Sequence, residues 1–124
     1  MWIYYQSNGK LCKENAHGKY EQTSHGYSGY GEGKNNYNLE STPNVGPIPC
    51  GQWVMGDAYT SKRVGPIAIP LTPHLHRAHS RTYFRIHGDS ASHPGEASKG
   101  CIILPRDVRK MMSDSVDRIL LVVA

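Results

Sequence analysis

One histidine and one cysteine in this chain have the surroundings that cysteine chemistry needs. His87 ends a short alternating run and precedes Gly88, whereas Cys101 follows Gly100 and opens the apolar run 101–104. A cysteine nucleophile needs a base that removes its proton and backbone N–H groups that face the reacting carbonyl. Two neighbouring strand ends joined by a polar loop would supply both.

The pattern gives each of these residues an expected role. Cys101 is the expected nucleophile and His87 the general base, because an imidazole titrates near neutral pH. We expect the cations around this pair to lower the pKa of the thiol. Ser98, Gly100 and Gly88 are expected to shape the loop beneath the oxyanion, with the Cys101 N–H as one donor. Taken alone, such a cysteine is more often a small buried hydrophobe, but the combination favours the nucleophile.

Charged residues near the pair have two alternative readings. Arg81 and Arg85 would pair with a substrate carboxylate through a bidentate fork, or are surface charges. Asp89 would orient the imidazole or cap a turn. Three more candidates for binding or orienting the substrate border the expected cleft: Lys99, Tyr27 and Ser28.

A second histidine cluster precedes the site. His74, His76 and His79 form the pattern His-x-His-x-x-His, and three histidines can hold zinc. The segment lacks a fourth ligand and a regular element that would orient the rings. We therefore expect no metal and no cofactor, and a substrate-facing loop in this segment.

Periodicity and turn residues predict a mainly β fold with one short helix near the C-terminus, in a single domain over residues 1–124. Pro66 and Pro70 indicate that the strand at 65–71 lies at an edge. Pro105 at a first helical position predicts a helix over 105–112. Alternating or apolar runs predict strands at 2–6, 10–13, 52–55, 65–71, 83–87, 101–104 and 119–123.

The strand at 83–87 has the clearest alternation. Tyr83, Arg85 and His87 share one face, and Phe84 and Ile86 share the other. The candidate base therefore stands on a polar face with the core behind it.

Charge and hydropathy limit the classes of partner. The net charge of +4 comes from scattered basic residues, and no nucleic-acid-binding motif is present. Residues 1–15 lack a basic region followed by an apolar one, so we expect no Sec-dependent export. No apolar run approaches the ~20 residues of a membrane span.

The two other cysteines leave two alternatives open. Cys12 and Cys50 are either a disulfide that spares Cys101 or two ordinary thiols.

The motifs resemble the L,D-transpeptidase (YkuD-like) family, in which His-Gly is followed by Ser-x-Gly-Cys. Lys99 replaces a second histidine of that pattern, and Ile103 replaces a polar residue. The L,D-transpeptidase-like toxins of type VI secretion systems tolerate both changes. The chain resembles these toxins over roughly residues 2–123 through an ordered set of blocks: 26–29 (GYSG), 33–36 (GKNN), 44–51 (NVGPIPCG), 86–89 (IHGD) and 98–102 (SKGCI).

This resemblance implies a β-sandwich and a cysteine acyltransferase that acts on peptidoglycan tetrapeptide stems. L,D-carboxypeptidase trimming and L,D-transpeptidase exchange of D-amino acids are the implied reactions. It also implies a toxin made in the cytoplasm, delivered by a secretion apparatus with a possible carrier, and active in the periplasm of a target bacterium. The producing cell would hold a cognate immunity protein.

Three alternatives remain at this point. A housekeeping cell-wall L,D-transpeptidase would normally carry an export signal or anchor. A peptidase of the NlpC/P60 type would place its cysteine before its histidine, and here the order of His87 and Cys101 is the reverse. A wall-binding or zinc-binding module would need no nucleophile.

Overall fold

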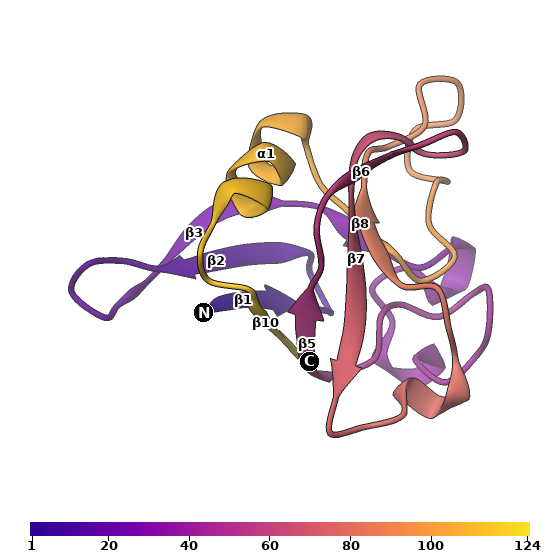
Figure 1. The fold of residues 1–124 in the computed structure, drawn as a ribbon. Coiled ribbons are helices and arrows are strands. Elements are labelled where there is room, and N and C mark those ends of the chain that lie inside the picture. Colours follow the sequence, from indigo (N-terminus) through magenta and orange to yellow (C-terminus); the bar gives the residue numbers. More distant parts are fainter.

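The computed structural model describes residues 1–124 and is mainly β, with one short helix near the C-terminus, as predicted (Figure 1). The helix α1 spans Arg106–Asp114 and begins after Pro105, which occupies the N-cap position. The strands are β1 Trp2–Tyr5, β2 Lys10–Glu14, β3 Tyr20–His25, β4 Tyr27–Ser28, β5 Gly51–Met55, β6 Tyr59–Ser61, β7 Gly65–His74, β8 Arg85–His87, β9 Ile102–Ile103 and β10 Ile119–Val123. Three short 3₁₀ turns lie at Gly31–Gly33, Tyr37–Leu39 and Ala78–Ser80.

The strands form one continuous path in the order β3-β2-β1-β10-β5-β7-β8-β9-β4, and β6 pairs with β7. The C-terminal strand β10 lies inside this path, parallel to β1 and antiparallel to β5. The segment after β9 therefore returns through α1 to the middle of the sheet, and this ties the candidate site to the body of the fold.

The first and last strands of the path, β3 and β4, are separated in the chain by Gly26 alone. Its N–H donates to the Gly9 carbonyl at 2.8 Å. A Cβ on Gly26 would overlap the Ile103 carbonyl oxygen, and a Cβ on Gly9 would overlap the Gly26 carbonyl. Three backbone segments thus meet where no side chain fits, and the sheet wraps around a shared core.

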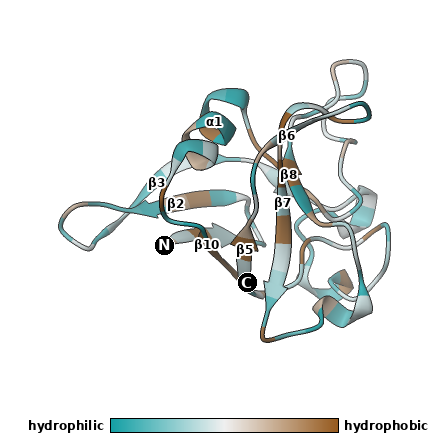
Figure 2. Ribbon diagram, in the orientation of Figure 1, coloured by the Kyte–Doolittle hydropathy of each residue, from teal (hydrophilic) through white to brown (hydrophobic).

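The core joins both ends of the strand path. Tyr4 and Leu11 from β1 and β2 belong to the same cluster of 17 buried residues as Ile86 and Ile102 from β8 and β9. Figure 2 shows the corresponding apolar stretches on the strands, with hydrophilic residues on the β2–β3 hairpin and the outer side of α1. Burial of these side chains, at roughly 25 cal/mol per Å² of apolar surface, is the main stabilising contribution.

Trp53 connects this core to the residues that precede the site. Its ring lies edge-on against Phe84, with centroids 4.9 Å apart, and its Nε1–H donates to the Pro49 carbonyl. Phe84 and Ile86 are core residues, as the alternation predicted. Tyr83 is 89% exposed and precedes β8, which is therefore shorter than the predicted strand 83–87.

The prediction that residues 65–71 form an edge strand is wrong, because β7 lies between β5 and β8. Proline removes only the backbone donor, and its carbonyl still accepts. The Pro70 carbonyl accepts from the Gly56 N–H, and Leu71 supplies the N–H that bonds the Phe84 carbonyl. Pro66 lies within the irregular part of the β6–β7 pairing, next to the Ser61↔Gly65 pair.

Candidate active site

Parallel pairing of β8 and β9 positions the two candidate catalytic residues. Ile86 pairs with Ile102 and His87 pairs with Ile103. Extending this register by one residue places Cys101 beside Arg85, with His87 two residues farther along β8. Neighbouring residues in register point to the same face of a sheet, and both isoleucines of the first pair face the core. Cys101, Arg85 and His87 therefore share the opposite face.

The distance between His87 and Cys101 follows from this register. A rise of ~3.3 Å per residue and a strand spacing of ~4.8 Å put their Cα atoms about 8 Å apart. No hydrogen bond joins the thiol to the imidazole. The hydrogen-bond acceptor of the thiol is the Tyr83 carbonyl, with Sγ and O 3.6 Å apart. The predicted Cys101–His87 pair thus stays a prediction, although both residues stand on one face.

Cys101 is only 8% exposed. Burial raises the pKa of its thiol, and the neighbouring Arg85 and Arg81 oppose this effect without cancelling it. The expectation of a thiol pKa lowered by nearby cations is therefore wrong for the resting protein. The sequence shows the cations but does not show how completely the sulfur is removed from water.

His87 has the hydrogen bond that a general base needs. Its Nδ1 lies 2.8 Å from the Gly88 carbonyl oxygen, and a carbonyl can only accept, so Nδ1 carries the proton and Nε2 the lone pair. Burial is the largest cause and lowers the pKa of His87, while the hydrogen bond to Gly88 opposes it. The charges of Arg85 and Arg109 lower the pKa by smaller amounts, and Asp89 raises it least, so the net pKa is below the ordinary value. The imidazole is therefore neutral at pH 7 and able to accept a proton.

Ser98 organises the loop that carries the cysteine. Its buried hydroxyl donates to the Cys101 carbonyl at 2.5 Å and accepts from the N–H groups of Gly29 and Gly100. Ser28 acts in the same way, because its hydroxyl donates to the Gly100 carbonyl and accepts from the Ile48 N–H. Both serines position the backbone around Cys101.

Gly100 has a φ of +138°, which favours glycine. A Cβ there would meet the Arg81 guanidinium and the Phe84 ring, so protein atoms fill this space. The four hydrogen bonds of Arg81 go to carbonyl groups, those of Glu40, Gly46, Pro47 and Lys99. Arg81 thus joins three loops beneath the cysteine, and its role as a carboxylate ligand stays a prediction.

Asp89 caps the loop that follows β8. It accepts from the N–H groups of Ser90 and Gly95 and from the Tyr27 hydroxyl, which lies 2.6 Å from Oδ1. The Tyr27 oxygen also accepts from the Ala97 N–H. Of the two roles considered for Asp89, the turn cap is the one with hydrogen bonds in the structure.

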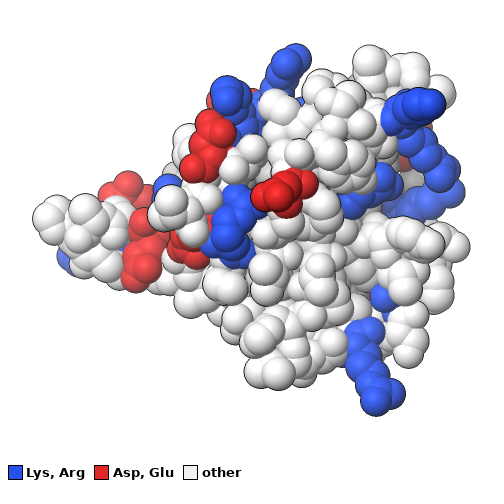
Figure 3. Space-filling model, viewed as in Figure 1, with Lys and Arg blue, Asp and Glu red and all other residues white.

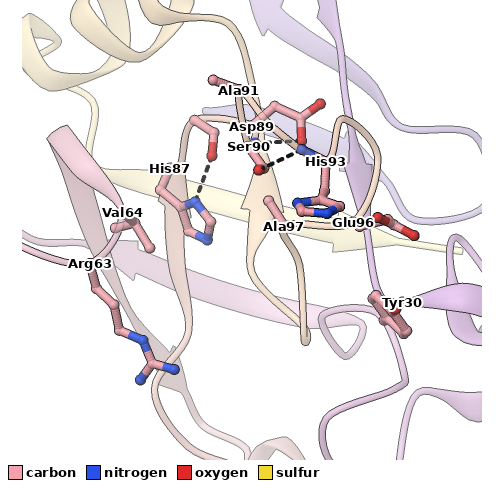
Figure 4. A pocket seen from close by; sticks show the side chains of 11 residues that line it. Tyr30, Arg63, Val64, His87, Asp89, Ser90, Ala91, His93, Glu96 and Ala97 are labelled. Carbon is pink, nitrogen blue, oxygen red and sulfur yellow. Dashed lines mark hydrogen bonds between the residues drawn. The ribbon is translucent and has the colours of Figure 1, made fainter.

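A cavity of about 660 Å³ opens beside His87 (Figure 4). Arg63 and Val64 line one side, the loop 88–97 lines the other, and Tyr30 lies beyond that loop. Cys101 does not line the cavity. A molecule held in this cavity therefore contacts the imidazole and not the thiol.

Two residues missed by the sequence reasoning support the site. Arg109 on α1 donates to the carbonyls of Leu104, Pro66 and Ile67, and its Nη2 would lie 2.7 Å from a Cβ on Gly88. Tyr59 accepts from Arg85 Nη1 at 3.1 Å. Nothing in the sequence marked Arg109 or Tyr59 as a residue that supports the site.

The two residues that depart from the general transpeptidase pattern have different settings. Ile103 is buried and pairs with Tyr27 of β4. The Lys99 side chain is exposed, while its carbonyl accepts from Arg81.

The second histidine cluster does not form a metal site, and no group of three metal-ligating side chains is assembled in the structure. His76 bonds the Gln52 carbonyl and the Ala78 N–H, and His79 bonds Glu40 at 2.9 Å.

Of the two alternatives for Cys12 and Cys50, the structure has two free thiols. No helix has the length and apolar character that a bilayer span requires.

The lowered pKa of His87 can be tested in the resting protein. We expect the imidazole chemical shifts of His87, followed by NMR and assigned with the variant His87→Gln, to titrate with a midpoint below the ordinary ~6.5. Burial and two nearby arginines disfavour the imidazolium, so the proton binds only at lower pH. A midpoint above ~6.5 would indicate a preformed imidazolium–thiolate pair and contradict the neutral pair described here.

Comparison with known proteins adds one match to this geometry. The family model of the Tlde1 domain matches residues 22–119, which include β8, β9 and the intervening loop. No curated protein and no solved structure matches the chain. Because the matched segment covers most of the sequence, the chain belongs to the Tlde1 domain family, whose members are type VI secretion effectors of the L,D-transpeptidase kind.

Proposed function

We propose that this protein is a cysteine-dependent peptidoglycan-modifying enzyme, delivered as an antibacterial toxin, that trims tetrapeptide stems or exchanges their terminal D-amino acid. The observation that supports this most is the β8–β9 register, which sets Cys101 and His87 on one face within a Tlde1 domain. The periplasm of the target cell is the compartment in which this substrate is found.

The reaction begins when His87 Nε2 accepts the thiol proton of Cys101. The thiolate attacks the carbonyl at the L-centre of the diamino acid in the stem, and a C–S bond forms. As the C–N bond to the terminal D-Ala breaks, the imidazolium returns the proton to the departing amine. A thioester remains on the enzyme.

Water or a free amine then attacks the thioester, and His87 accepts its proton. Water gives the trimmed tripeptide, and a D-amino acid or stem amine gives exchange or crosslinking. The cavity beside His87 suits this step, since a molecule held there meets the base that must deprotonate it. In both outcomes the sulfur regains a proton as it leaves.

The charge distribution supports a substrate that carries carboxylates. On the face in Figure 3, Lys and Arg predominate toward the end that carries β6 and β8, Asp and Glu gather toward the β2–β3 hairpin, and both signs of charge occur at α1. Arg63 lines the cavity together with the carboxylates of Asp89 and Glu96, and Arg85 stands beside the thiol. Stem peptides carry free carboxylates and would be attracted to this end.

The variant Cys101→Ala should lose essentially all trimming and exchange, because Cys101 is the thiol that shares a sheet face with His87. Chromatography and mass spectrometry of muropeptides incubated with the purified protein measure this directly. Cys12→Ala is the matched control and should retain wild-type activity, since Cys12 lies on β2. Trimming by Cys101→Ala at the wild-type rate would show that Cys101 is not the nucleophile.

Export should decide toxicity, since the proposed substrate is outside the cytoplasm. We expect growth to stop when the chain is expressed with an added periplasmic export signal, and to continue when the same chain stays in the cytoplasm. Co-expression of the cognate immunity protein in the periplasm should restore growth. Equal killing from both compartments would indicate a cytoplasmic target instead.

A further inference from the structure

Arg85 has a guanidinium beside the Cys101 thiol, and one of its buried donors has no hydrogen-bond partner. The β8–β9 register places it directly opposite Cys101, nearer than His87. The Arg81 hydrogen bonds go to four backbone carbonyls, so that side chain serves the surrounding loops. Arg85, by contrast, bonds one side-chain hydroxyl, that of Tyr59.

The Arg85 Nε is a buried donor with no hydrogen-bond partner in the resting structure. An unpaired buried donor is unfavourable for stability, so its retention needs an explanation. The guanidinium cannot turn freely to find another partner, because Nη1 is held by the Tyr59 hydroxyl at 3.1 Å. The Arg85 Nε–H therefore has no partner, although the guanidinium that carries it is bonded to Tyr59 and lies beside the sulfur.

The resting partner of the thiol is one that a thiolate cannot keep. The Tyr83 carbonyl oxygen accepts a hydrogen bond from the S–H group. Once the thiol has lost its proton, this oxygen and the negatively charged sulfur would repel each other. When the proton moves to His87 Nε2, the sulfur keeps the electron pair and needs donors. The main-chain N–H and the guanidinium of Arg85 are the donors that lie against it.

We propose that Arg85 is a catalytic residue that stabilises the Cys101 thiolate, with its unpaired Nε–H becoming a donor to the sulfur once His87 has taken the proton. This rests on the proposed function and assigns Arg85 to the nucleophile instead of to a substrate carboxylate. Three groups besides Arg85 face the sulfur: the cation of Arg81, the Tyr83 carbonyl and, along β8, His87.

The test is the pH dependence of Cys101 alkylation by iodoacetamide, a neutral reagent that offers no carboxylate to bind. Peptide mapping separates Cys101 from the other two cysteines. We expect Arg85→Met to raise the midpoint of the pH–rate profile by about one pH unit or more. At a fixed pH below both midpoints, the variant should be alkylated about threefold more slowly than the wild type for each unit by which its midpoint is higher. The thiolate fraction is then tenfold lower, but a more basic thiolate is more nucleophilic and offsets part of this loss.

Two further variants separate charge from structure. Arg85→Lys keeps a cation and should recover part of the shift, whereas Arg63→Met removes an arginine of the neighbouring cavity and should leave the midpoint unchanged. Tyr59→Phe removes only the hydroxyl that holds Nη1 and should shift the midpoint upward by less than Arg85→Met. Because the midpoint is read and not the absolute rate, a change in access to the buried sulfur does not imitate the effect.

An unchanged midpoint in Arg85→Met, in protein that unfolds cooperatively like the wild type, would overturn the proposal. If that variant also raised KM for a tetrapeptide with kcat unchanged, Arg85 would be a substrate-carboxylate ligand instead. If Arg85→Met does not fold, Tyr59→Phe and Arg85→Lys decide, and two unchanged midpoints overturn the proposal. The proposed enzyme is tested separately by Cys101→Ala, so either idea can fail alone.

Discussion

The parallel pairing of β8 with β9 determines where the proposed catalytic residues lie. Parallel strands need a crossover of about a dozen residues or more, and the segment between His87 and Cys101 is long enough to provide it. A shift of one residue in this register would turn Cys101 into the core and Ile102 out of it. The packing of Ile86 and Ile102 in the core thus fixes which side chains share the reactive face.

The surrounding fold holds this pairing through arginine and serine side chains. Ser98 and Ser28 bond the backbone at both sides of Gly100, Arg81 joins three loops beneath it, and Arg109 links α1 to β7. The buried side chains of Arg81 and Arg109 donate their hydrogen bonds to backbone carbonyls. Hydrogen bonds from a charged donor are worth roughly 1.5–3 kcal/mol each, so these contacts contribute substantially to keeping the loop in place.

The sequence predicted the mainly β fold, the helix near the C-terminus, the terminal strand 119–123 and the core face of Phe84 and Ile86. Periodicity and turn residues are local signals, and these features are local. The central place of β7 could not be read from its prolines, because strand order depends on pairing between distant segments. The direction of the thiol pKa was predicted wrongly for a related reason, because the 81–83 segment, distant from Cys101 in the chain, helps to remove the sulfur from water.

The central claim, that Cys101 carries the acyl group, is tested most directly by the mass of the protein during turnover. A reaction with purified tetrapeptide substrate, quenched in acid at early times, should contain protein heavier by the donor peptide less its terminal D-Ala. Peptide mapping should place this adduct on Cys101, and it should disappear at later times as product accumulates. Product formation without an adduct on Cys101 at any time, or with an adduct on another residue, would contradict the account.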